Sequence, residues 1–173
     1  MAIDQNNPFI LASRKIAQHN GTEQILLLLL TPLIDFAQRI GCTRIGSSGE
    51  TPRGIPFRLK GRSYDLFSFW VERLDVPGPD RQGLAAIAFD PERLHEELRS
   101  DFLSLMAQLQ RKSGYRLAKN GNYDVQAVSF TTAAEGLQVL AAIDNFISAA
   151  VERLGIAAFP TPEINIRRTQ QYR

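Results

Sequence analysis

By type and spacing, the residues of this chain best suited to chemistry are its arginines and lysines, which are concentrated in two stretches. Between Phe36 and Tyr64 there are six basic residues and one acidic residue, and between Phe102 and Tyr123 there are four basic residues and no acidic residue. The formal net charge of the chain is only +2, so the remaining sequence is acidic in compensation. Segregated charge of this kind produces a local positive field. The basic residues expected to form a contact surface are Arg44, Arg53, Arg58, Lys60, Arg62, Arg111, Lys112, Arg116 and Lys119.

Aromatic residues interleave with these charges, because Tyr64, Tyr115 and Tyr123 lie beside or within the same stretches. Arginine contacts phosphate and an aromatic ring stacks on a base, a combination that suits nucleic-acid binding without catalysis. We therefore expect segments 43–62 and 111–123 to form one surface that binds a polyanion, preferentially nucleic acid, either DNA or RNA. No recognised RNA motif or DNA-reading helix is present in the sequence. The alternative is ordinary solvated surface charge, some of it paired with the acidic residues of a predicted helix.

Metal and nucleophile chemistry find little support in the sequence. His95 lies in LHEEL, where a zinc-binding helix needs a second histidine four residues later, but that position is Arg99. The single cysteine, Cys42, can form no internal disulfide and offers no second thiolate ligand. Ser47 and Ser48 lie in a glycine-rich loop that matches neither a nucleophile elbow nor a phosphate-binding P-loop. We therefore expect no catalytic residue, no metal and no cofactor.

A metal-dependent nuclease is a further alternative. Such a site needs one acidic residue, followed on the next strand by a second acidic residue and a lysine two positions apart. Together these side chains bind Mg²⁺ and activate water. Asp65, Glu72 and Asp124 are the candidate carboxylates, although Leu74 stands where the lysine is required. This alternative requires the three carboxylates to converge in the fold.

Composition places the chain among soluble globular proteins. Its 173 residues fit one domain, with 44% hydrophobic and 22% charged residues. The longest apolar run, Ile25 to Leu30, is far shorter than the roughly 20 residues of a membrane span, and the first residues lack the features of a secretory signal. The lone cysteine agrees with a reducing compartment, so we expect a cytoplasmic protein that does not enter a membrane.

Helix signals are clear in four places. Pro32 lies inside the second predicted helix and predicts a kink or a break near Thr31. Thr132 and Glu135 have the spacing of a capping box at the start of the fourth. The expected helices span 8–20, 22–41, 91–112 and 132–154.

Strand signals lie between these helices. Residues 46–56 are turn-rich and predict a mobile loop. The segment 64–74 is apolar on both faces, which is typical of a central strand covered on each side. Asn120-Gly121 predicts a hairpin turn, because asparagine and glycine tolerate the backbone angles that a type I′ turn needs. The expected strands are 57–59, the segment from Arg62 onward, 84–89, 115–119 and 122–130.

The order of elements predicts an α+β fold. Strands joined by short turns must be antiparallel, and long helices would cover at least one face of the sheet. We expect an antiparallel sheet of about five strands packed by long helices, in the approximate order α-α-β-β-β-β-α-β-β-α. Residues 1–159 are expected to form one domain, followed by a loosely held basic tail, 160–173.

The order helix, three strands, helix, two strands, helix is similar to that of type III secretion chaperones and their relatives. The second half also resembles modules attached to some restriction-type proteins. Both resemblances rest on element order without a shared motif, and neither implies a functional residue. The first implies an alternative function, a dimeric protein-binding adaptor or chaperone. The predicted helix 132–154 has an apolar stripe of Leu137, Leu140, Ile143, Ile147, Val151 and Leu154. A second contact face would come from alanines that we expect away from this stripe, namely Ala133, Ala134, Ala141, Ala142, Ala149 and Ala150.

Overall fold

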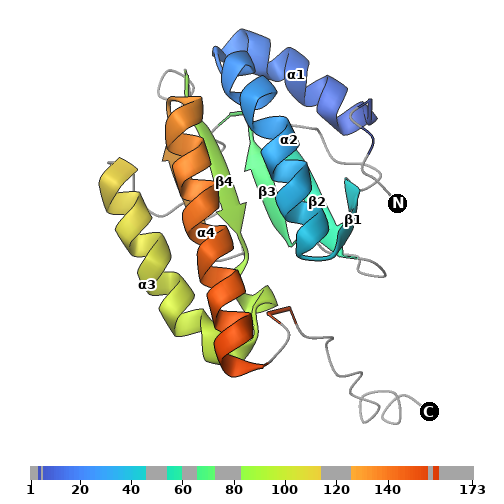
Figure 1. Ribbon diagram of the computed structural model, residues 1–173. Coiled ribbons are helices and arrows are strands. Elements are labelled where there is room, and N and C mark those ends of the chain that lie inside the picture. Colours follow the sequence, from blue (N-terminus) through green and yellow to red (C-terminus); the bar gives the residue numbers. More distant parts are fainter. Residues whose placement is uncertain are drawn as a thin grey trace, which may run out of the picture.

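A five-stranded antiparallel sheet with helices against one face forms the fold (Figure 1). The computed structural model describes residues 4, 6–45, 54–59, 66–72, 83–113, 126–155 and 158–159. The antiparallel sheet and the helices packed against it confirm the predicted α+β class. The elements are α1 (Pro8–Asn20), α2 (Glu23–Arg39), β1 (Cys42–Ile45), β2 (Gly54–Leu59), β3 (Phe67–Trp70), β4 (Ala85–Phe89), the short 3-10 helix η2 (Pro91–Arg93), α3 (Glu96–Ser113), β5 (Gln126–Phe130) and α4 (Ala133–Leu154).

The strands follow one another across the sheet in chain order, β1-β2-β3-β4-β5, and each neighbouring pair is antiparallel. The predicted central strand is confirmed, since β3 lies in the middle of the sheet. A row of stacked phenylalanines crosses the sheet at this point. The ring of Phe67 lies 4.5 Å from that of Phe57 and 5.0 Å from that of Phe89, measured between centroids. Such offset stacks add to the free energy gained by burying the rings.

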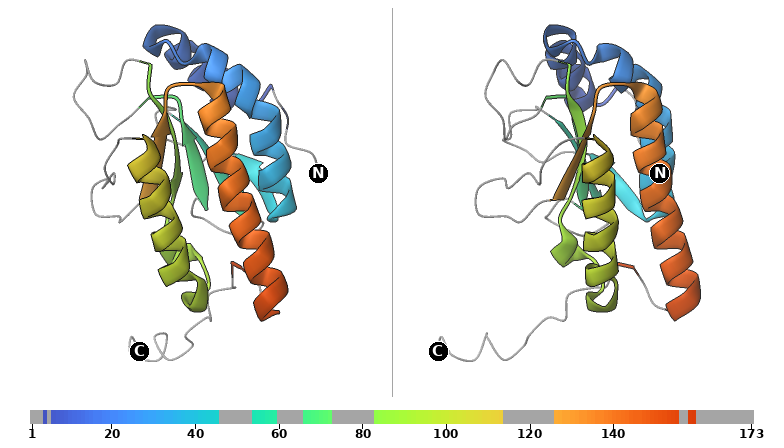
Figure 2. Two further views of the ribbon diagram at one scale, coloured as in Figure 1. Left: turned by 60° about the vertical axis from the view of Figure 1, so that its left-hand side comes forward. Right: turned by 90° about the vertical axis from the view of Figure 1, so that its left-hand side faces the viewer.

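The two faces of the sheet have different surroundings. Helices α2 and α4 lie side by side over one face, as both views of Figure 2 show, and Phe57, Ile87 and Val128 point into the core beneath them. No helix among the described residues covers the other face, which we call the helix-free face. Because side chains alternate along a strand, its residues are those between the core residues, namely Gly54, Pro56, Arg58, Ser68, Trp70, Ala86, Ala88, Ala127 and Ser129.

The ends of α1 and α4 form as their sequence signals predict. The side chain of Asn7 accepts a hydrogen bond from the Phe9 amide at 2.9 Å, and Gly21 ends α1 with a left-handed φ of 77°. Thr132 Oγ1 accepts from the Glu135 amide at 3.2 Å at the start of α4. These side chains satisfy amides that a helix leaves without partners, and glycine enters the left-handed region at no steric cost.

Two local predictions need correction. Pro32 does not break α2, which runs without interruption to Arg39. The carbonyl that Pro32 leaves unpaired belongs to Leu28, whose side chain is 52% exposed, so water can reach this part of the helix. Gly54 and Pro56 belong to β2 and not to a loop. Pro56 is paired with Ser68 of β3, and no described residue of β1 lies opposite it.

Two helix predictions also differ in detail. Asp90 opens the short helix η2, and α3 begins only at Glu96, because Leu94 adopts an extended conformation. On α4, Leu137 and Val151 are 42% and 36% exposed, whereas Ala150 is buried in the core. The predicted strand 115–119 and its turn at Asn120-Gly121 lie outside the described residues.

Candidate functional site

Most of the predicted contact surface lies outside the described residues, and Arg58 is its one member with a described side chain. Arg44 lies on β1, and Arg111 and Lys112 lie near the end of α3, but only their backbone is described. The predicted site residues outside the described ranges are Arg53, Lys60, Arg62, Tyr64, Tyr115, Arg116, Lys119 and Tyr123.

The register of the first two strands brings two of the predicted residues together. Arg44 on β1 is the direct partner of Arg58 on β2. Directly opposed residues in an antiparallel pair have Cα atoms roughly 5 Å apart. Like charges in this arrangement destabilise the pair of strands unless other charge compensates them. The register is also irregular between Cys42 and Arg44.

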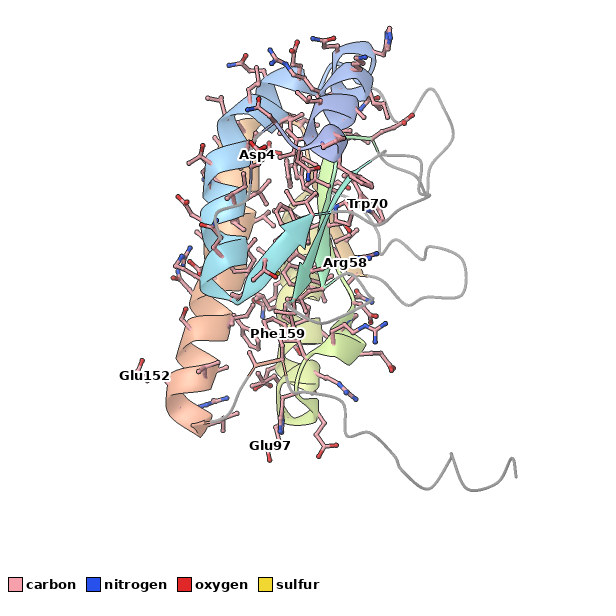
Figure 3. All side chains as sticks on the ribbon, turned by 90° about the vertical axis from the view of Figure 1, so that its right-hand side faces the viewer. Asp4, Arg58, Trp70, Glu97, Glu152 and Phe159 are labelled. Atoms are coloured by element: carbon pink, nitrogen blue, oxygen red, sulfur yellow. The ribbon has the colours of Figure 1, made fainter. Side chains whose placement is uncertain are left out.

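Arg58 and Trp70 lie on the helix-free face, on the side of the sheet away from α2 and α4 (Figure 3). Arg58 is 9% exposed and Trp70 is 6% exposed. The indole belongs to a small apolar cluster with Ala86, Ala88 and Ala127. The three alanines lie on the adjacent strands β4 and β5, beside the indole on β3.

Ser129 is a buried polar residue at the far side of the same face. It lies opposite Ala86 on β4 and is fully buried. Its hydroxyl oxygen makes no hydrogen bond in the part of the chain that the structure describes. A buried hydroxyl without a hydrogen-bond partner costs free energy of folding. Hydrogen bonding on this part of the face is therefore less complete than in the core.

The described parts of the two basic stretches lie towards opposite edges of the sheet. Near the end of α3, Gln110 Nε2 donates a hydrogen bond to the Ala127 carbonyl of β5 at 3.0 Å. This contact places Arg111 and Lys112 on the β5 side of the fold, whereas Arg58 lies on β2. Three interstrand spacings, about 14 Å, separate these strands. A single ligand that contacts both stretches must therefore span the width of the sheet.

Arg39, a basic residue of the first stretch, forms an ion pair between two helices. Arg39 Nη1 binds both carboxylate oxygens of Asp144, at 2.8 Å and 2.7 Å, and joins the end of α2 to the middle of α4. This ion pair lies on the helical side of the sheet. The positive charge of Arg39 is thus compensated by a carboxylate from α4.

The structure adds no candidate catalytic site among the residues that it describes. No cluster of three or more histidine, cysteine or carboxylate side chains occurs there. Asp65 and Asp124 lie outside these ranges, so the nuclease alternative stays a prediction. Glu72 is the second residue after β3. Burial raises the pKa of the Cys42 thiol to about 12, which keeps it protonated and poorly nucleophilic at neutral pH.

Among the described helices, α4 is the one with the length and hydropathy that a membrane crossing would need. Core helices of soluble proteins meet the same criterion, and Val139, Ile143 and Ile147 of α4 are buried in the core.

Sequence reasoning missed a buried polar corner where α1 meets α2. The side chains of Asn20 and Thr22 are 7% and 0% exposed, and both bind the Val71 carbonyl at the end of the central strand. The sequence shows Asn20 only as the last residue before a helix-ending glycine.

Comparison with known proteins adds no relative. No protein-family model, curated protein or solved structure matches the chain. The resemblance in element order to secretion chaperones therefore gains no support from these comparisons.

Proposed function

We propose that this protein binds a polyanion without catalysis, preferentially nucleic acid, and that Arg44 and Arg58 supply central phosphate contacts. The observation that carries the proposal is their direct opposition on β1 and β2. Two directly opposed arginines on neighbouring strands can contact one phosphate, since guanidinium groups bind phosphate oxygens through charge-assisted, often bidentate hydrogen bonds.

Base contacts are assigned to the tyrosines of the same stretches, Tyr64, Tyr115 and Tyr123. Tyrosine rings beside phosphate-binding arginines favour single strands, whose bases are free to stack.

The test is a salt titration of binding by the full chain. Fluorescence anisotropy with labelled single-stranded DNA, single-stranded RNA and duplex DNA gives the dissociation constant at each salt concentration. Binding that relies on phosphate contacts weakens linearly in log–log form as salt rises. Replacing one phosphate-binding arginine reduces the magnitude of that slope by about 1.

Arg44→Gln is the informative variant, and Arg153→Gln is its matched control. Both variants remove one positive charge. Arg153 lies on α4, its side chain is 65% exposed, and its Nη2 atom is 3.8 Å from Oδ2 of Asp101. We expect a shallower salt dependence for Arg44→Gln and an unchanged one for Arg153→Gln. Equal effects of the two variants, or no binding at low salt, would refute the proposal. Arg58→Lys, which keeps the charge of a buried site, is expected to bind more weakly because lysine cannot make a bidentate contact.

A dimeric protein-binding adaptor is the second candidate, favoured by apolar side chains on the outer surfaces of the helices. Leu27 and Leu28 on α2 are 44% and 52% exposed, and Leu137 on α4 is 42% exposed. Light scattering over a dilution series tests it, with Leu28→Glu as the variant expected to disrupt association. A monomer at all concentrations would rule out the dimer.

A further inference from the structure

The corner between α1 and α2 is tied to the sheet through one asparagine. Asn20 Nδ2 donates to the Val71 carbonyl at 3.0 Å and to the Leu84 carbonyl at 3.2 Å. The Asn20 carbonyl accepts a hydrogen bond from the Gly83 amide at 2.7 Å. Val71 follows β3 and Leu84 precedes β4, so Asn20 holds both ends of the connection between these strands.

The residue after Asn20 makes this corner chemically vulnerable. In an Asn-Gly pair, the glycine amide nitrogen can attack the asparagine side-chain carbon Cγ, because glycine has no side chain to hinder it. A bond forms between Gly21 N and Asn20 Cγ, the Cγ–Nδ2 bond breaks, and ammonia leaves with the amide proton. Water then opens the resulting succinimide ring to leave aspartate or isoaspartate.

The folded corner opposes each part of this reaction. The Gly21 amide donates its proton to the Ala17 carbonyl, so the attacking nitrogen is already engaged. Both hydrogen atoms of the leaving amide group point to carbonyl oxygens of the sheet ends. Asn20 is also the last residue of α1, and its helical conformation differs from the one that ring closure needs.

The product would not fit the same corner. A carboxylate at position 20 has no hydrogen atoms to donate, and it would face two carbonyl oxygens where the amide now donates two bonds. Burial of an ionised group without a donor is strongly unfavourable. Isoaspartate would in addition insert a carbon atom into the main chain at a helix end.

We propose that Asn20-Gly21 is a conformationally gated deamidation site, which stays intact while the corner is closed and reacts when it opens. The reaction converts a transient opening of the corner into a permanent one, because the product cannot restore the bonds to Val71 and Leu84. The inference does not depend on the proposed nucleic-acid binding.

Peptide mapping by mass spectrometry tests the protection. The full chain is incubated at mildly alkaline pH, folded or in denaturant, and the tryptic peptide 16–39 is followed over time. The second Asn-Gly pair of the chain, Asn120-Gly121, lies in a different tryptic peptide and reports the intrinsic rate in denaturant. We expect Asn20 to react at the same rate as Asn120 in denaturant, and at least about tenfold more slowly in the folded protein. A tenfold protection corresponds to an opening free energy of about 1.4 kcal/mol. Equal rates for Asn20 in the folded and denatured chain would overturn the proposal.

The variant Asn20→Asp tests the consequence, with Asn145→Asp on the exposed side of α4 as the matched control. The surroundings of position 20 would raise the pKa of the new carboxyl above its usual range, because they favour the protonated form. A raised folded-state pKa means that stability is lost as pH rises. We therefore expect Asn20→Asp to shift the denaturation midpoint downward more at pH 8 than at pH 4, and Asn145→Asp to shift it little at either pH. An Asn20→Asp protein as stable as the parent at pH 8 would contradict the second part of the proposal.

Discussion

Replacing Gly136 by alanine sets two physical effects of opposite sign against each other. Gly136 lies inside α4, where alanine is favoured over glycine by about 1 kcal/mol of helix propensity. A Cβ atom at this position would lie 2.6 Å from Leu29 Cδ1 and 2.7 Å from Phe130 Cε2. Favourable carbon–carbon contacts are about 3.5–4.0 Å, so both neighbours must move by roughly an ångström.

Neither neighbour can move easily, because Leu29 is 0% and Phe130 is 1% exposed. Inserting a methyl group into a well-packed core costs about 1–3 kcal/mol, which exceeds the propensity gain through most of that range. We expect Gly136→Ala to lower the free energy of unfolding by up to about 2 kcal/mol. For a chain of this length, each kcal/mol changes the melting temperature by roughly 2–4 °C.

Chemical denaturation followed by circular dichroism measures the change. Ala141→Gly on the exposed side of α4 is the matched control, since it reports helix propensity alone and should cost about 1 kcal/mol. In a Leu29→Ala background, where one of the two obstructing side chains is truncated, Gly136→Ala should destabilise the protein less than it does in the parent. Stabilisation by Gly136→Ala in the parent protein would show that α4 does not pack against α2 and β5 as closely as the structure indicates.

Three further predictions concern single contacts. Thr132→Ala removes the acceptor for the Glu135 amide and should cost about 1 kcal/mol in denaturation experiments, whereas Thr132→Ser should cost much less. Hydrogen bonds from Gln18 and Arg14 lower the pKa of Glu23, so its stabilising contribution is present above the ordinary glutamate pKa and is lost as pH falls through the lowered value. NMR titration should show this pKa rising towards the ordinary value in Gln18→Ala, and an unchanged value would contradict the contact. The buried Cys42 thiol, with its pKa raised to about 12, should react with a thiol reagent only as fast as the protein opens, and rapid labelling of the folded protein would refute its burial.

The signals that the sequence revealed correctly are local ones. The helix starts at Asn7 and Thr132 follow from side chains that cap amides two or three residues away. The central position of β3 follows from apolar residues on both of its faces. By contrast, β1 is a four-residue edge strand without alternation, and the propensities of Gly54 and Pro56 favour a loop. Pairing with β3 overrides those propensities, because a strand gains its stability from a neighbour that the local sequence does not contain.

The sequence determined where the basic residues lie along the chain, but tertiary structure decided which of them are brought together. Arg44 and Arg58 are opposed through the register of β1 and β2, and a shift of one residue would separate them. Arg39, from the same basic stretch, is compensated by Asp144, which is 105 residues away. Asn20 likewise binds carbonyls 51 and 64 residues away. Charge and helix capping depend on residue type and near neighbours, whereas pairing across the fold depends on how the whole chain buries its apolar surface.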